Sequence, residues 1–266
     1  MSLRFWAVII IILVAVGAAI AFGGGKKPSS AKITAEESGA SPAAANVVSD
    51  ISSVPTATFD EVGQGLASSY PKSISAPALT ENNKPEIYYE GAEYCPYCAT
   101  ERWAMAIALA RFGTFTNLKV SHSSTSDVYP DTQTLSFYGS TYKSNYVTFT
   151  PIEMYTNIAS ENGGYTTLQT PTTAEQNLTS KYDPSGGIPF IDFGGKYDIS
   201  GATYNPQVLS GSSWSKIAGS LANPGNNISE GVDGAANTIT AAICKLTSNQ
   251  PGTVCDTVIQ ALETKL

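Results

Sequence analysis

Histidine and charged residues are scarce in this sequence. His122 is the single histidine among 266 residues, so a site built from several histidine ligands is excluded. Charged residues make up 14% of the chain, whereas a typical soluble domain has about 25%. The 15 basic residues are outnumbered by 22 acidic ones, and no stretch offers a basic face for phosphates. We therefore expect no nucleic-acid partner.

One long apolar run lies near the amino terminus. Residues 5–22 are apolar or glycine and follow Arg4. At about 1.5 Å per residue such a helix is roughly 27 Å long, which is enough to cross the hydrocarbon core of a bilayer. The run is longer than the apolar region of a usual signal peptide, so we predict a transmembrane anchor over residues 1–25. A cleaved signal peptide is the alternative, because Ala19-Ile20-Ala21 fits a cleavage site.

The rest of the chain divides at a change of composition. Residues 26–50 are rich in small and polar residues, which predicts a flexible linker. From residue 51 onward aromatic and β-branched residues recur, and we predict one folded domain over residues 51–266 with a helical extension at its carboxyl end. The order strand, helix, strand, hairpin, helix is typical of an α/β sandwich with a mixed central sheet and flanking helices. The segments that carry this prediction are strands at 87–89 and 118–121, strands and loops over 129–157, a hairpin at 188–199, and helices at 96–111, 172–180, 206–221, 229–246 and 252–262.

The most specific motif is Cys95-Pro96-Tyr97-Cys98, placed where the first strand gives way to a helix. Two cysteines in a first helical turn are close enough to form a disulfide. Backbone N–H groups at the helix start would stabilise the thiolate of Cys95, and Pro96 suits the first helical position. We predict that Cys95 attacks a client and that Cys98 resolves the mixed disulfide. A structural disulfide and a zinc site remain alternatives, although no further zinc ligands lie near the motif.

A proline further along the chain fits the same interpretation. Thioredoxin-like folds place a cis-proline just before a strand and against the cysteine pair. Pro189, which follows Ile188 and precedes a predicted hairpin, matches that arrangement. We expect Pro189 to shape a substrate groove together with Ile188, Pro96 and Tyr97. A trans proline at the start of a strand is the alternative.

Several longer motifs resemble one family. They are Gly91–Trp103 (GAEYCPYCATERW), Ala110–Phe115, Asp127–Pro130, Phe137–Gly139, Phe149–Glu153 and Ile188–Asp192. Together they resemble the thioredoxin-like family catalogued as domain of unknown function 929, over a region from Val54 to the carboxyl terminus. The resemblance implies a membrane-anchored thioredoxin-like domain. It implies no substrate.

The cysteine motif is also similar to the active sites of thioredoxin and glutaredoxin, and its Pro-Tyr pair is that of glutaredoxin. One position departs from thioredoxin, which has a buried aspartate six residues before its first cysteine. Here that position is Tyr89, and Glu90 beside it is expected on the opposite face of the strand. A reductase mechanism of the thioredoxin type is not implied by these residues.

The remaining two cysteines lie near the carboxyl terminus. If Cys95 pairs with Cys98, then Cys244 and Cys255 are left to pair with each other across a polar turn. We predict a structural disulfide there, with a second redox pair or two free thiols as alternatives. Persistent disulfides are typical of proteins outside the cytosol. Sequons at Asn177 and Asn227 are a weak further indication of the same location.

Glu93, Arg102 and His122 are the polar residues to consider beside the motif. We expect Glu93 to be a solvated neighbour of the cysteines and Arg102 to be a surface residue, although a closer Arg102 would favour the thiolate. His122 is expected to be a polar residue at the end of a strand. The alternative is that it binds copper together with Cys95 and Cys98.

These patterns predict a thiol–disulfide oxidoreductase attached to the cell membrane by a single span, with its main domain outside the cytoplasm. Its partners would be protein thiols and disulfides and, through the anchor, the lipid bilayer. No cofactor and no metal are expected, because the exchange needs only sulfur. Two alternatives remain, a non-catalytic binding or structural subunit of an envelope complex and a copper-delivery protein.

Overall fold

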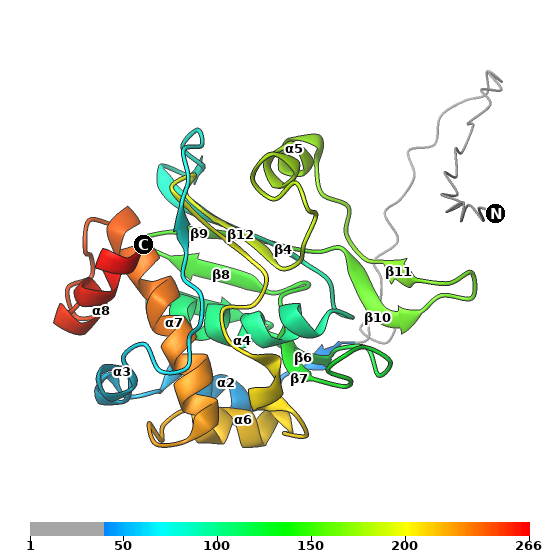
Figure 1. The fold of residues 1–266 in the computed structure, drawn as a ribbon, viewed down its shortest axis with the longest axis horizontal. Coiled ribbons are helices and arrows are strands. Elements are labelled where there is room, and N and C mark those ends of the chain that lie inside the picture. Colours follow the sequence, from blue (N-terminus) through cyan, green and yellow to red (C-terminus); the bar gives the residue numbers. More distant parts are fainter. Residues whose placement is uncertain (1–39) are drawn as a thin grey trace, which may run out of the picture. The chain divides into compact units, whose positions relative to one another are not determined.

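A computed structural model describes residues 40–266, so the predicted anchor and most of the predicted linker lie outside the described residues. Within residues 40–266 the chain forms a mixed sheet with helices on both faces (Figure 1). This arrangement confirms the predicted α/β class. No helix in this part of the chain combines the length and the hydrophobicity that a bilayer span requires.

The central sheet has six strands in the described region. Five lie in the order β2-β13-β12-β4-β3, and β9 also pairs with β4. β4 and β9 run parallel, whereas β12 is antiparallel to both of its neighbours. The strands are β2 (Lys72–Ser73), β3 (Thr80–Glu81), β4 (Lys84–Gly91), β9 (Thr148–Glu153), β12 (Phe190–Phe193) and β13 (Tyr197–Ser200).

Side chains alternate between the two faces of β4, as the pleat of a strand requires. Ile87 and Tyr89 belong to the larger core, which contains the residues of two long helices. Tyr88 points to the other face and packs with Phe190 and with Leu178 of a third helix. The sheet is therefore covered on both sides (Figure 1). The helices concerned are α4 (Pro96–Ala110) and α7 (Asn227–Leu246) on one face and α5 (Thr173–Tyr182) on the other.

Shorter strands form three small sheets around this centre. They are β1 (Ser41–Pro42) with β6 (Lys119–His122) and β7 (Gln133–Ser136), β5 (Gly113–Thr116) with β8 (Thr141–Ser144), and β10 (Tyr155–Ala159) with β11 (Tyr165–Thr167). The β10–β11 hairpin lies beside the end of the central sheet from which α4 starts (Figure 1). The remaining helices are α2 (Ala45–Ser52), α3 (Thr56–Val62), η1 (Pro206–Leu209), α6 (Trp214–Ser220), α8 (Thr257–Leu262) and η2 (Glu263–Lys265).

The hairpin predicted at residues 188–199 is present as β12 and β13, joined by a three-residue loop of Gly194, Gly195 and Lys196. Both glycines have positive φ, 62° and 71°, a backbone conformation that glycine adopts without steric cost. The N–H of Gly195 donates to the carboxylate of Asp192 at 2.6 Å. The turn therefore fixes the register of the strand that begins directly after Pro189.

The folded domain begins earlier than predicted. Part of the region assigned to a flexible linker, residues 45–50, lies in α2, where Val47 is almost completely buried in the main core. The sequence signal for this helix is weak because the helix has only eight residues, of which three are large and apolar. The helix predicted over 206–221 is interrupted at Ser210, and the one predicted from Gly252 begins only at Thr257.

Candidate functional site

The Cys95–Cys98 motif begins α4, as its sequence predicts. Cys95 is the N-cap residue, with extended backbone angles, and Pro96 occupies the first helical turn. The N–H of Cys98 donates to the Cys95 sulfur at a distance of 3.3 Å. Both cysteines are free thiols. The sulfur of Cys95 therefore occupies the position of a helix cap, where backbone N–H groups favour negative charge.

The two thiols differ in acidity. The pKa of Cys95 is lowered, chiefly by a side-chain hydrogen bond with Cys98, while burial opposes this and the Arg102 guanidinium adds to it. The pKa of Cys98 is raised well above the ordinary thiol value, chiefly because this residue is completely buried. The thiol of Cys95 therefore ionises more readily than the thiol of Cys98.

The other residues predicted for the groove lie around the same sulfur. The Cys95 thiol donates to the Ile188 carbonyl at 3.6 Å, and the Ile188–Pro189 peptide bond is cis. Pro96 and Pro189 are buried, whereas 41% of the Tyr97 side chain is exposed. The tertiary structure therefore brings the residues of the CPYC motif and those of the Ile188–Pro189 loop together at one place.

Cys95 is less accessible than its position at a helix start suggests, since only 5% of it is exposed. Tyr94, the preceding residue, stacks on Tyr165 with ring centroids 4.2 Å apart and also contacts Tyr155. Both partners belong to the β10–β11 hairpin, and the carbonyl of Tyr155 accepts a hydrogen bond from the N–H of Glu93. The hairpin thus packs against the loop that precedes the cysteines. The sequence does not predict this packing, because Tyr94 lies far from Tyr155 and Tyr165 in the chain and nothing local indicates that their rings meet.

A buried ion pair lies inside the domain next to the motif. The Arg102 guanidinium donates two hydrogen bonds of 2.7 Å to the carboxylate of Glu153, and neither side chain is exposed. Arg102 also donates to the Ala92 carbonyl at 2.7 Å. Burial raises the pKa of Glu153 to about 7, although the arginine opposes this rise. The pair thus ties α4 to β9 and to the loop before Cys95.

The expectations for Glu93 and Arg102 were therefore wrong. Both residues are completely buried. Glu93 accepts a hydrogen bond from the Ser136 hydroxyl, and its charge acts on Arg102. The reason is that α4 is enclosed on all sides up to Leu109, except at Tyr97, so its charged residues must find partners inside the protein.

Tyr89 occupies the position where thioredoxin has its buried aspartate, and it is completely buried too. Burial raises its pKa well above the ordinary value. Glu153 is the registered neighbour of Gly91 in the parallel β4–β9 pair, and its charge acts on the Tyr89 hydroxyl. Sequence reasoning missed Glu153 because the pairing of these strands cannot be read from either one alone.

The Nδ1 atom of His122, at the end of β6, lies 3.0 Å from a carboxylate oxygen of Asp131. Across residues 40–266 no three His, Cys, Asp or Glu side chains lie close enough to hold a metal ion. His122 therefore does not join Cys95 and Cys98 in a copper site in this structure.

Cys244 and Cys255 form a disulfide with a Cα–Cα distance of 5.6 Å. The bond links the last turn of α7 to the segment that precedes α8. Both cysteines are buried.

The fold and the site define a class, namely mixed α/β proteins that hold a CxxC pair at the amino end of a buried helix. The family model described as "Domain of unknown function (DUF929)" matches residues 70–245, which is more than half of the chain. The chain belongs to this family, and the resemblance stated from its motifs is confirmed. No curated protein and no solved structure gives a significant match.

Proposed function

We propose that this protein is a thiol–disulfide oxidoreductase that acts on polypeptide clients through Cys95 and Cys98. The observation that carries the proposal is the unequal pair at the start of α4. One sulfur caps the helix and has a lowered pKa, while the other is buried behind it with a raised pKa. A structural disulfide would not need this difference in acidity.

A thioredoxin-like fold is part of the proposal. The chain first forms a β-α-β unit from β4, α4 and β9, which is followed by the helix α5. An antiparallel hairpin of β12 and β13 and then the helix α7 come after it. The sheet order β9-β4-β12-β13 places the hairpin next to the strand that leads to the cysteines. Both the order and the location of Pro189 agree with the thioredoxin pattern.

The exchange would proceed in two steps. The Cys95 thiolate attacks one sulfur of a client disulfide, which forms a mixed disulfide and releases a client thiolate that takes up a proton. Cys98 then loses its proton and attacks the Cys95 sulfur, which forms the Cys95–Cys98 disulfide and releases the second client thiolate. Two electrons pass to the client, and the reverse sequence would oxidise a client dithiol.

Exposed apolar side chains near the motif support a polypeptide as the client. Large hydrophobic residues with substantial exposure in the described region are Leu66, Tyr97, Val128, Tyr155 and Ile158. Tyr97 lies within the motif and contacts Tyr129, the neighbour of Val128, while Tyr155 and Ile158 belong to the adjacent hairpin. Such a rim around a reactive group is suited to binding an unfolded or extended chain.

We also propose that the protein acts outside the cytoplasm, anchored by residues 1–25. The Cys244–Cys255 disulfide supports this location, since structural disulfides are rare where cellular thiols are kept reduced. The apolar run at residues 5–22 supports the anchor.

The low exposure of Cys95 favours a second candidate, a binding subunit that keeps the fold but exchanges no disulfides. A nucleophile must be reached by its substrate, and 5% exposure allows this only if the surrounding loops move. The two candidates differ in whether Cys95 captures a client.

The experiment uses full-length protein with Cys98→Ser, expressed in its host and isolated after thiols are blocked. We expect this variant to retain clients as mixed disulfides, because the resolving thiol is missing. Cys95→Ser is the matched control and should retain none. If neither variant captures a partner and Cys95 in the unmodified protein resists alkylation after reduction, the binding subunit replaces the enzyme.

A further inference from the structure

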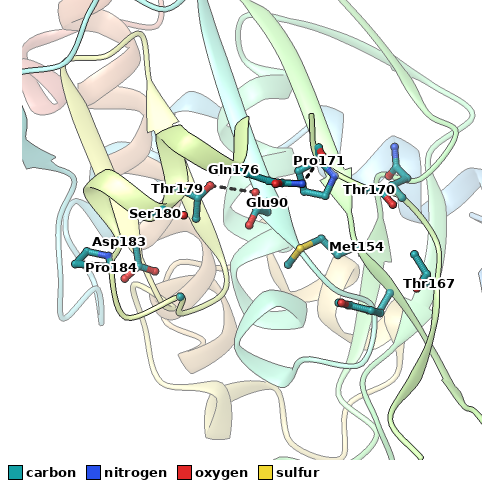
Figure 2. A pocket seen from close by; sticks show the side chains of 13 residues that line it. Glu90, Met154, Thr167, Thr170, Pro171, Gln176, Thr179, Ser180, Asp183 and Pro184 are labelled. Atoms are coloured by element: carbon teal, nitrogen blue, oxygen red, sulfur yellow. Dashed lines mark hydrogen bonds between the residues drawn. The ribbon is translucent and has the colours of Figure 1, made fainter. Parts of the chain in front are cut away.

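A cavity of about 530 Å³ has walls of mixed polar and apolar residues, which Figure 2 shows. Its walls come from the end of β4, the start of β10, the segment after β11, α5, and the loop that leads from α5 to Pro189. Its volume is within the range of ordinary ligand pockets. The expected groove residues Pro96, Tyr97 and Ile188 do not line it, so the cavity is separate from the sulfur contact itself.

The cavity adjoins the site on two sides. Gly186, in its wall, is two residues before Ile188, whose carbonyl accepts the hydrogen bond from Cys95. Tyr155, also in its wall, accepts a backbone hydrogen bond from Glu93, two residues before the same cysteine. An extended peptide with its cysteine at Cys95 therefore needs only a few more residues to reach the cavity.

Two carboxylates with open hydrogen-bonding capacity line the cavity. Glu90 is 6% exposed, and its Oε2 accepts from the hydroxyls of Tyr88 and Thr179, the latter at 3.0 Å (Figure 2). Both of these hydrogen bonds go to the same oxygen of the Glu90 carboxylate. Asp183 is 5% exposed, and its Oδ2 is buried without a hydrogen-bond partner in the described part of the chain.

No lysine, arginine or histidine lines this cavity. The other polar residues in its wall are uncharged, and include Gln169, Gln176 and Ser180. Buried carboxylate oxygens in proteins normally have a donor, and a cation nearby is the strongest one. A group that brings its own positive charge and N–H donors would complete the site.

We propose that this cavity binds the lysine or arginine side chain of a client peptide, close to the client's cysteine. The inference rests on the proposed exchange function and assigns its substrate class, which is polypeptides with a basic residue near the reactive sulfur. Glu90 is held in place by its two hydroxyl donors and presents its second oxygen to the cation. Asp183 supplies the second carboxylate from the loop that carries Pro189.

The test uses peptides that contain one cysteine joined by a disulfide to a coloured aryl thiol. Lysine, glutamine or glutamate is placed in turn at each position flanking the cysteine. Release of the aryl thiol by reduced full-length protein measures exchange. Peptides with serine in place of the cysteine measure binding by fluorescence anisotropy, independently of any sulfur chemistry.

We expect the best lysine peptide to exchange and bind about tenfold better than its glutamate counterpart, as for a charged hydrogen bond in a partly enclosed site. Glu90→Gln and Asp183→Asn should each abolish most of this preference while the variants keep their thermal unfolding transition. Glu61→Gln, which removes an exposed carboxylate on α3, is the matched control and should leave the preference unchanged. If Glu90→Gln fails to fold, the peptide preference of Asp183→Asn alone tests the proposed cation site.

The outcomes separate this inference from the function on which it rests. Equal exchange of the lysine, glutamine and glutamate peptides would overturn the cation site and leave the oxidoreductase standing. A lysine preference in binding without thiol release from any peptide would support the site and overturn the oxidoreductase. Binding of N-acetyl-lysine amide as tightly as the lysine peptide would overturn the assignment to client chains, since the cavity would then be a site for small amines.

Discussion

Arg102 of α4 holds both carboxylate oxygens of Glu153 of β9 at 2.7 Å, and neither residue has any exposed surface. The two residues are 51 positions apart in the sequence. Their contact joins the helix that carries the cysteines to the strand parallel with β4. The positive charge of Arg102 also lowers the pKa of Cys95, so one side chain contributes both to the fold and to the acidity of this thiol.

Replacement of Arg102 by Gln should therefore have two effects. It leaves the buried Glu153 carboxylate without its partner, which should cost about 3–5 kcal/mol in the free energy of unfolding. It should also raise the pKa of Cys95, which the pH dependence of alkylation measures. The double variant with Glu153→Gln should regain much of the stability but not the low pKa. Equal pKa values for Cys95 in the unmodified protein and in Arg102→Gln would show that the arginine does not act on the thiolate.

Removal of the Tyr165 ring should make Cys95 more accessible. In Tyr165→Ala the stack on Tyr94 is lost, and we expect alkylation of Cys95 by iodoacetamide to become several-fold faster. Tyr165→Phe is the matched control, because it keeps the ring and removes only the hydroxyl that donates to Ser124 at 2.7 Å. The alanine variant would contradict the covering role of the hairpin if it reacted at the rate of the phenylalanine variant.

Glu101 should make stability depend on pH. Burial raises its pKa from 4.5 to about 7, although the N–H and hydroxyl of Thr203 donate to its carboxylate and oppose this rise. Because the folded state holds this proton more tightly, the contribution is fully present below pH 4.5 and is lost as the pH rises to about 7.

The corresponding experiment compares the unmodified protein with Glu101→Gln by urea unfolding at several pH values. The difference in unfolding free energy between the two should change by about 3 kcal/mol from acidic to neutral pH, in the direction that favours the unmodified protein in acid. A constant difference would mean that Glu101 has the same pKa in the folded and unfolded chains.

The disulfide between Cys244 and Cys255 should stabilise the domain without taking part in exchange. The two residues are 11 positions apart, and a loop of this size corresponds to about 3 kcal/mol in the chain-entropy description. The double variant Cys244→Ala with Cys255→Ala should lose about that much in chemical denaturation. Its Cys95 should react with the aryl disulfide peptides at the unmodified rate, and a parallel loss of exchange would indicate a relay through all four cysteines.

Local features of the site could be predicted because they depend on residues close together in the chain. Pro96 in the first helical turn and the strand before it are enough to place Cys95 at a helix cap. The two glycines at 194 and 195 are enough to predict a hairpin after Pro189. The family was likewise evident from motifs around the cysteines, and the match over residues 70–245 confirms it.

Burial and long-range partners could not be predicted in the same way. Glu93 and Arg102 have the sequence character of surface residues, yet both are enclosed, because the sheet, α7 and the loops around the motif surround α4. The start of the folded domain was misplaced for a related reason, since Val47 is buried only through contacts with distant residues.

The sequence by itself determined the CxxC pair, its place at a strand–helix junction, the turn after Pro189 and the family. The tertiary structure alone decided that Glu153 reaches Arg102, that Tyr165 stacks on Tyr94 next to Cys95, and that Glu90 and Asp183 line one cavity. The physical reason is that helix caps and tight turns are set by the backbone angles of a few consecutive residues. Ion pairs, stacked rings and cavities are set by the register in which distant strands and loops come together.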